Sequence, residues 1–341
     1  MWENSRVHYC LKLGPREAAW AESGRNWWGR RRDRCRLAQL PPGLIQPSPV
    51  EPNITDPAAL ATRLRALIQP DAPGRSAVHR LMAQAQAQIP RPVALIVPDL
   101  CVRAVIFRLD NVPTRSEERE ALIRWRLGQE QLFPLVGAKV VSQPLSTNGK
   151  RTTGPQTVLA VAIQETVLRQ YEAACESAGL VPMQVDVASF RLFNLWARAS
   201  QAGEGNGPED LLWLSLLDGG LTLLIFHAGQ LVFLRSKLQL RRARVADESD
   251  RPEAEPVDRV MAEIAASLLS CAETYPALAA QRLILVSDGP EPGLARQLSG
   301  EFGVEVEELG VAQAEYAGWN SANASMPRGV LPAIAGLLGG G

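Results

Sequence analysis

The chain has 341 residues, of which 46% are hydrophobic and 21% are charged, as in an ordinary soluble protein of one large or two medium domains. Lys plus Arg and Asp plus Glu both number 36, so the net charge gives no reason to expect a nucleic acid or an anionic membrane as a direct partner. The five Cys and three His form no paired metal-ligand spacing, which argues against a zinc site and favours buried thiols in a reducing compartment.

The N-terminal region predicts two short strands around a turn at Gly14. An Arg- and Trp-rich run at 25–36 follows. We interpret it as a solvated loop, and a patch for phosphate or anionic lipid is the alternative, because Arg and Trp suit a membrane interface. A Pro-rich extended stretch leads to a helix at 56–68, which opens on a cap residue followed by Pro. Residues 70–88 are interpreted as an insertion with an Ala/Gln helix.

The stretch 91–135 reads as two strands that feed an amphipathic helix over 116–133. Ser116 predicts the start of this helix. Three acidic residues in its first turns complement the positive end of the helix dipole, which explains them better than acid–base catalysis does: Glu117, Glu118 and Glu120. Trp125 and Phe133 are expected in the core rather than at a cofactor site. The alternative is that this helix borders a groove for a partner peptide.

The rest of the chain alternates between strands and helices. Before a Gly-rich linker at 201–210, the pattern predicts strands at 158–163 and 181–187 and helices at 164–178 and 188–198. After the linker it predicts strands at 211–217, 221–226, 231–240, 282–287 and 304–307, and helices at 257–274, 294–302 and 326–338. The charged segment 241–256 is interpreted as disordered. The apolar run 211–234 is interpreted as buried strands rather than a membrane span, because polar residues and glycines interrupt it.

Both halves of the chain contain a strand, a tight turn and another strand. The turns are Leu13-Gly14-Pro15 and Leu217-Asp218-Gly219-Gly220. This duplication is typical of the actin and sugar-kinase type of fold, in which a nucleotide lies between two α/β halves. We therefore predict a first half at 1–200, with a small inserted subdomain at about 91–157, and a second half at 201–341.

The order of these motifs resembles PilM-type proteins, the FtsA-related, actin-like cytoplasmic components of type IV pilus machines. The similarity covers the two strands and the Glu-rich helix of 91–135, the segment 158–196, and the run 212–240 with its Asp-Gly-Gly turn, Thr222 and Arg235. The resemblance implies an α/β, actin-like ATPase (ribonuclease H-like) duplicated fold with a small inserted subdomain.

The same resemblance implies a set of nucleotide-binding positions: Gly14, Asp218, Gly219, Gly220, Thr222, Gly289 and Gly293. Three departures argue against tight binding of ATP and Mg²⁺. Lys12 replaces an acidic residue of the family and is either a cation for phosphate or a surface Lys. Asp288 replaces a glycine and repels phosphate. The segment 241–256 replaces a loop and helix that shape the adenine pocket. The alternative interpretation of Asp218-Gly219-Gly220 is a plain hairpin turn.

By resemblance, the function is that of a cytoplasmic scaffold that holds the N-terminal peptide of a PilN-like inner-membrane protein and links it to the pilus motor. We expect the peptide groove near Val93 to Arg108. The chain has no secretory signal, so it is expected in the cytoplasm, at the membrane only through its partner. No catalytic residue or metal ligand is predicted, and ATP hydrolysis is not expected. The alternatives are a nucleotide-switched actin-like protein and a related component of type II secretion.

Overall fold

The computed structural model describes residues 7–24, 28, 32–69, 90–110, 112–129, 134–145, 156–201, 210–238, 256–289, 293–321 and 326–338. The predicted insertion at 70–88 and residues 241–255 of the predicted disordered segment lie outside these ranges. The chain divides into two compact units. Unit 1 comprises 1–102, 163–205 and 310–341, and unit 2 comprises 103–162 and 206–309. Each unit is described by itself.

Unit 1 is built on a five-stranded sheet with the order β3-β2-β1-β4-β8. Its strands are β1 (Tyr9–Leu13), β2 (Glu17–Glu22), β3 (Arg34–Gln39), β4 (Arg91–Val97) and β8 (Leu180–Val187). The first three are antiparallel neighbours, whereas β4 runs parallel to both β1 and β8. Parallel neighbours need crossover connections, which here include helices.

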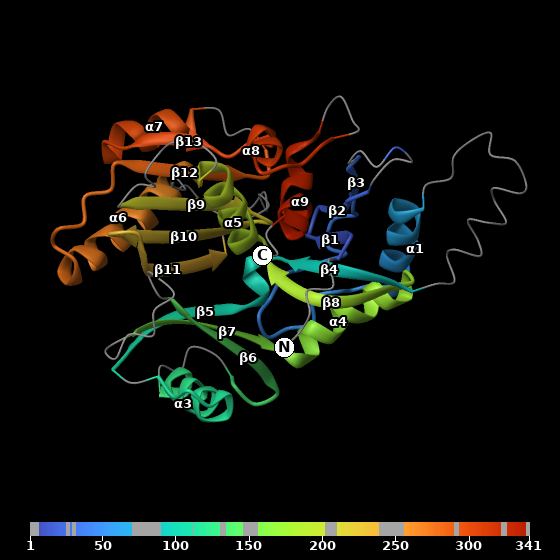
Figure 1. Cartoon of the computed structure of the whole chain (residues 1–341), viewed down its shortest axis with the longest axis horizontal. Helices are drawn as coiled ribbons and strands as arrows, with labels where there is room; N and C mark the ends of the chain where they lie inside the picture. The colour runs from blue at the N-terminus through green and yellow to red at the C-terminus, as the bar shows by residue number, and fades with distance from the viewer. Residues whose placement is uncertain are drawn as a thin grey trace, which may run out of the picture. The chain divides into compact units, whose positions relative to one another are not determined.

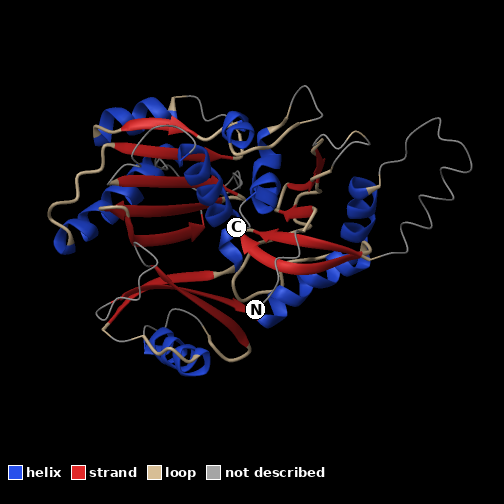
Figure 2. Ribbon diagram, in the orientation of Figure 1, coloured by secondary structure: helices blue, strands red, loops and turns tan. Residues whose placement is uncertain are grey.

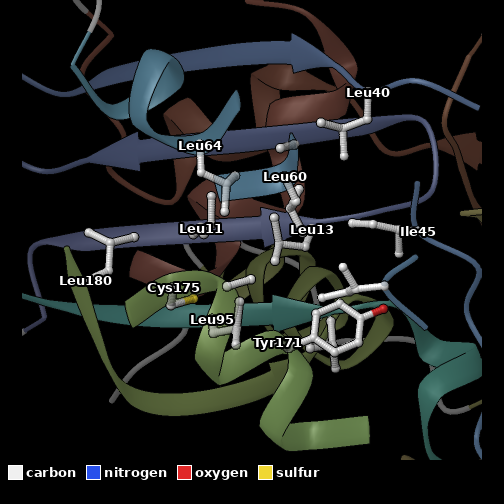
Figure 3. Close-up of a cluster of buried hydrophobic side chains, with 14 of the residues drawn as sticks. Leu11, Leu13, Leu40, Ile45, Leu60, Leu64, Leu95, Tyr171, Cys175 and Leu180 are labelled. Atoms are coloured by element: carbon white, nitrogen blue, oxygen red, sulfur yellow. The ribbon is translucent and has the colours of Figure 1, made fainter. Parts of the chain in front are cut away.

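Helices cover both faces of this sheet. They are α1 (Pro57–Ile68), α4 (Glu165–Ser177), α5 (Ala188–Gln201), α8 (Val311–Tyr316) and α9 (Leu331–Leu338), with 3₁₀ turns η1 (Asp99–Cys101) and η2 (Arg328–Val330). On one face, Leu60 and Leu64 of α1 and Tyr171 of α4 meet Leu11 and Leu95 of the sheet in a buried core (Figure 3). On the other face, α9 packs on β1, β2 and β4. The alternation of side chains along β1 therefore supplies two apolar layers.

Unit 2 holds a second five-stranded sheet with the order β11-β10-β9-β12-β13 (Figure 1). Its elements are β9 (Leu211–Leu217), β10 (Gly220–His227), β11 (Gln230–Leu238), β12 (Arg282–Ser287), β13 (Glu305–Glu308), α6 (Pro256–Thr274) and α7 (Leu294–Phe302). Strands β9, β10 and β11 form two hairpins, and β12 runs parallel to β9 and to β13. Leucine-rich strands and the two helices enclose its core.

Unit 2 also contains a three-stranded sheet with the order β5-β7-β6 and one helix on its face (Figure 2). These elements are β5 (Arg103–Leu109), α3 (Ser116–Gln129), β6 (Ala138–Leu145) and β7 (Gln156–Gln164). Ile123 and Leu127 of α3 pack on Phe107, Val140 and Val158. The small sheet thus has its own core.

Most predicted elements are confirmed, including the two strands within the apolar run 211–234. In the part of the chain that the structure describes, no helix is long and apolar enough to cross a membrane. The expectation for Trp125 is wrong, because its side chain is 57% exposed on the side of α3 away from the sheet. Phe133 lies outside the described residues. Strands β3 and β6 and the short helix α8 were not predicted.

The compact units group the chain differently from the predicted halves. Residues 310–341, placed in the second half from sequence, belong to unit 1, because α9 packs on β1 and β4. Residues 103–162, the core of the expected inserted subdomain, belong to unit 2. The division into two duplicated halves stays a prediction, because the compact units show which residues pack together and not which segments are related by duplication.

Candidate functional site

The β9–β10 connection is a two-residue hairpin turn. Leu217 pairs with Gly220, which leaves Asp218 and Gly219 as the central residues, with φ of 55° and 77°. Positive φ at both central positions defines the hairpin turn that suits the twist of the flanking strands. A Cβ at position 219 would meet nothing within 4 Å. The glycine is therefore favoured by backbone conformation rather than by space.

The carboxylate of Asp288 binds this turn. The backbone N–H of Asp218 donates to Oδ2 of Asp288 over 2.7 Å. The backbone N–H of Asp288 in turn donates to the carbonyl of Leu216 over 3.3 Å. The hydroxyl of Ser287 donates to the carbonyl of Gly289 over 2.6 Å, which fixes the chain on either side of Asp288. The end of β12 and the β9–β10 turn are thus joined by hydrogen bonds.

The other predicted nucleotide positions in unit 2 have separate roles. Thr222 is 4% exposed and lies opposite Ser236, with their hydroxyl oxygens 3.0 Å apart. Gly293 precedes α7 in the left-handed conformation, with φ of 87°. Residues 290–292, which connect Gly289 to Gly293, lie outside the described residues. The structure thus joins Asp218, Gly219 and Gly220 in one turn and places Asp288 and Gly289 beside it, whereas the Thr222 hydroxyl faces the next strand.

Gly14 belongs to unit 1, where its N–H donates to the carbonyl of Glu17 over 3.0 Å and closes the β1–β2 turn. The interpretation of Lys12 as a surface residue is wrong, because its side chain is 1% exposed. Its Nζ lies 4.0 Å from Oε1 of Glu17. A charge buried without a partner is costly, so this ion pair accounts for a lysine inside the unit.

Sequence reasoning missed a polar cluster where β4 and β8 end. Asp99, just after β4, accepts hydrogen bonds from the backbone N–H of Ser189, over 3.0 Å, and from its hydroxyl, and so caps α5. Arg191 donates through Nε to Oδ2 of Asp186 over 2.6 Å. Burial raises the pKa of Asp186, and the Arg191 guanidinium opposes that shift. These acids are bound within the unit, so they hold α5 on the sheet. The available signal was an Asp near the end of each of these two strands.

The face of the small sheet opposite α3 carries a partly exposed apolar surface. Ile106 pairs with Leu159 and Ala104 with Val161, and all four are partly exposed. Val141 of the outer strand β6 alternates with Val140, which packs on α3, and is 57% exposed. We call these five residues the outer apolar face. Of the groove predicted at Val93 to Arg108, the segment 93–97 is buried in the unit 1 sheet and offers no surface.

Metal and thiol chemistry find no support within the described ranges. No group of three or more His, Cys, Asp or Glu there could hold a metal ion. All five cysteines are buried thiols, as expected. Burial raises the pKa of Cys175 to about 12, so its reactive thiolate is scarce at neutral pH.

Comparison with known proteins rests on structure. No protein-family model matches the chain, and no curated protein matches it. Among solved structures, the chain is similar to the "PilM-PilN type IV pilus biogenesis complex", with a TM-score of 0.69 and 20% identity over 98% of this chain and 97% of that one. This likeness confirms the predicted α/β, actin-like ATPase fold and, at the level of fold, the resemblance to PilM.

Two further solved structures are similar to the chain at lower TM-scores. A Bacteroides thetaiotaomicron protein with an actin-like ATPase fold gives a TM-score of 0.43 at 12% identity, over 93% of this chain and 97% of that one. The cytoplasmic domain of EpsL, an inner-membrane component of the Vibrio cholerae type II secretion system, gives 0.41 at 12% identity, over 91% and 93%.

Proposed function

We propose that this chain is a scaffold of type IV pilus assembly that binds the cytoplasmic N-terminal peptide of a PilN-like inner-membrane protein and links it to the motor. The observation that supports the proposal is the similarity in fold to a structure whose printed title is a PilM–PilN complex, over 98% of this chain. In this proposal the chain is cytoplasmic and reaches the inner membrane through its partner.

The outer apolar face supports peptide binding rather than catalysis. Four of its residues form two cross-strand pairs, Ala104–Val161 and Ile106–Leu159, so it presents a continuous apolar strip. Strand β6 lies at the end of the β5-β7-β6 order, so its outer edge has no partner strand within this sheet. An extended peptide can add to such an edge by main-chain hydrogen bonds and place alternate side chains on the same face, next to β6. Val141 lies on that strand and on that face.

The scaffold role uses neither ATP hydrolysis nor a metal. A groove for a peptide needs shape and apolar surface, whereas hydrolysis needs a positioned water and a stabilised phosphoryl group. The candidate turn in unit 2 offers backbone amides and one further acid, Asp288. We therefore propose that the chain acts by binding and not as an enzyme.

The test uses two Val→Glu variants that differ only in place. Val141→Glu puts a charge on the outer apolar face, where the side chain is 57% exposed, so folding should be preserved. Val136→Glu is the matched control, because Val136 is 93% exposed in the turn before β6. The tagged chain is used to capture a single-pass protein from solubilised inner membranes. A synthetic peptide of that protein's cytoplasmic N-terminus is then titrated by fluorescence anisotropy.

We expect Val141→Glu to weaken peptide binding at least about tenfold, a loss of about 1.4 kcal/mol, and Val136→Glu to leave it unchanged. Equal affinities for the wild type and both variants would place the peptide elsewhere on the chain. Failure to recover any single-pass membrane protein would contradict the scaffold role itself.

A further inference from the structure

The β9–β10 turn has the form of an anion site, and one of its amides already has a charged ligand. Its two central residues, Asp218 and Gly219, have positive φ, and backbone N–H groups in such turns can line a concave site for anions. We propose that this turn is an anion site filled by the chain's own Asp288 carboxylate, which excludes the phosphate groups of a nucleotide from unit 2.

The geometry of the contact is that of a bound anion. The 2.7 Å between the Asp218 nitrogen and Oδ2 of Asp288 lies in the short range of hydrogen bonds to a charged acceptor. A phosphate oxygen bound to the same N–H would occupy the same place. Because an N–H has one hydrogen to donate, carboxylate and phosphate compete for it.

The carboxylate is held in position by its backbone. Asp288 directly follows β12, whose last residue, Ser287, pairs with Leu216 next to the turn. The N–H of Asp288 also binds Leu216, and Ser287 binds Gly289. The side chain therefore projects from a fixed point beside the turn. Any phosphate that displaced it would still face a negative charge within a few ångströms.

The remaining groups of the candidate site do not favour phosphate either. The Thr222 hydroxyl lies 3.0 Å from that of Ser236. In unit 1, the Lys12 side chain is buried, and its Nζ lies 4.0 Å from Oε1 of Glu17. The Glu17 carboxylate therefore balances the positive charge of Lys12 within the unit. A Lys there also supplies no ligand for Mg²⁺, which prefers oxygen. The residues present therefore do not fit Mg·ATP as the resemblance would imply.

If Asp288 fills the turn, the chain does not respond to nucleotide through this site. This proposal does not depend on the peptide-binding proposal. A chain that bound no pilus peptide would still have a filled turn, and a chain that bound the peptide with an open turn would retain a nucleotide switch. The two proposals are tested by different ligands and different variants.

The experiment compares the wild type with Asp288→Ala, and uses Asp110→Ala as the control. Asp110 is an exposed acid in a bend after β5, so its removal changes the charge equally without touching the turn. Amide hydrogen exchange is measured by NMR at Asp218. Inorganic pyrophosphate is then titrated while the amide signals of Asp218 and Gly219 are followed, and Mg·ATP is titrated into the wild type by calorimetry.

We expect Asp288→Ala to speed exchange of the Asp218 amide at least about tenfold and to let pyrophosphate shift both amide signals, because the competing acceptor is gone. The wild type and Asp110→Ala should show neither effect, and the wild type should give no heat with millimolar Mg·ATP. Micromolar binding of Mg·ATP by the wild type would overturn the proposal. So would unchanged Asp218 exchange, or no pyrophosphate shift, in Asp288→Ala. Should that variant fail to fold, Asp288→Asn is titrated in its place; because Asn keeps an acceptor oxygen and removes only the charge, this variant is judged by the pyrophosphate shift alone.

Discussion

Gly336 lies on α9 where this helix contacts the unit 1 sheet, so replacing it tests how closely the helix packs there. A Cβ at this position would lie well inside van der Waals contact of the Cys10 sulfur and 3.1 Å from Cδ1 of Ile96. Both side chains are fully buried, so neither has room to move aside. Overpacking a buried site costs about 1–3 kcal/mol. Alanine is about 1 kcal/mol better than glycine inside a helix. We expect Gly336→Ala to lower the free energy of unfolding by up to about 2 kcal/mol, as the net of these two opposing terms.

A double-mutant cycle with Cys10→Ala separates the clash from other effects. Removing the sulfur makes room for the new methyl group, so the double variant should be more stable than the sum of the two single changes predicts, with a coupling energy of about 1 kcal/mol. Gly300→Ala on α7 is the matched control, because a Cβ there would meet nothing within 4 Å. It should be neutral or stabilising, by up to about 1 kcal/mol.

The assay must measure the stability of unit 1 separately, because the two compact units need not unfold in a single transition. Hydrogen exchange of the β1 and β4 amides reports the free energy of opening unit 1 directly. A stabilising effect of Gly336→Ala, together with no coupling to Cys10→Ala, would refute the packing of α9 on β1 and with it the assignment of residues 310–341 to unit 1.

Two further predictions concern ionisable groups. Burial by itself raises the pKa of Asp210, but the N–H groups of Ala279 and Ala228 and the ring of His227 together hold it below its usual value. Asp210 should therefore stabilise unit 2 above about pH 4 and lose that effect as the pH falls further. The difference in stability between wild type and Asp210→Asn should shrink from pH 7 to pH 3, and an equal difference at both would contradict this. Because burial raises the pKa of Cys175 to about 12, a thiol reagent at pH 8 should label it only after urea is added, and rapid labelling of the native protein would show that the site opens.

The elements that could be predicted from sequence are those whose residues carry one strong signal. The strands β9, β10 and β12 are mostly buried, so each is a largely apolar run of strand length. Helix α1 begins where the cap and proline predict, and the Asp56 carboxylate accepts from the N–H of Ala59 over 2.9 Å. In these segments local chemistry and tertiary packing agree, which is why pattern reasoning succeeds.

The missed elements depend on their neighbours. Strand β6 contains Lys139, Ser142 and Pro144 and has buried residues only in its first half, so its alternation is weak in sequence. Helix α8 has six residues, too few for a periodic pattern. In α3, Trp125 lies opposite the buried pair Ile123 and Leu127, because these aliphatic residues, four positions apart, meet the sheet. The sequence analysis expected the Trp125 side of this helix to be buried, whereas the small sheet packs on the side of Ile123 and Leu127.

The candidate site divides in the same way. The Asp-Gly-Gly turn could be found from sequence because a hairpin of this geometry needs residues that tolerate positive φ. The hydrogen bond from Asp218 to Asp288 could not, because the two residues are 70 positions apart and meet only through the pairing of β9 with β12. The geometry of the hairpin also limits what the Asp-Gly-Gly motif can indicate about function. The turn connects β9 and β10 whether or not an anion binds, so the hairpin alone accounts for the presence of Asp218 and Gly219. The contact with Asp288 adds to a turn that the β9–β10 hairpin already requires, so the Asp-Gly-Gly motif by itself does not identify a nucleotide site.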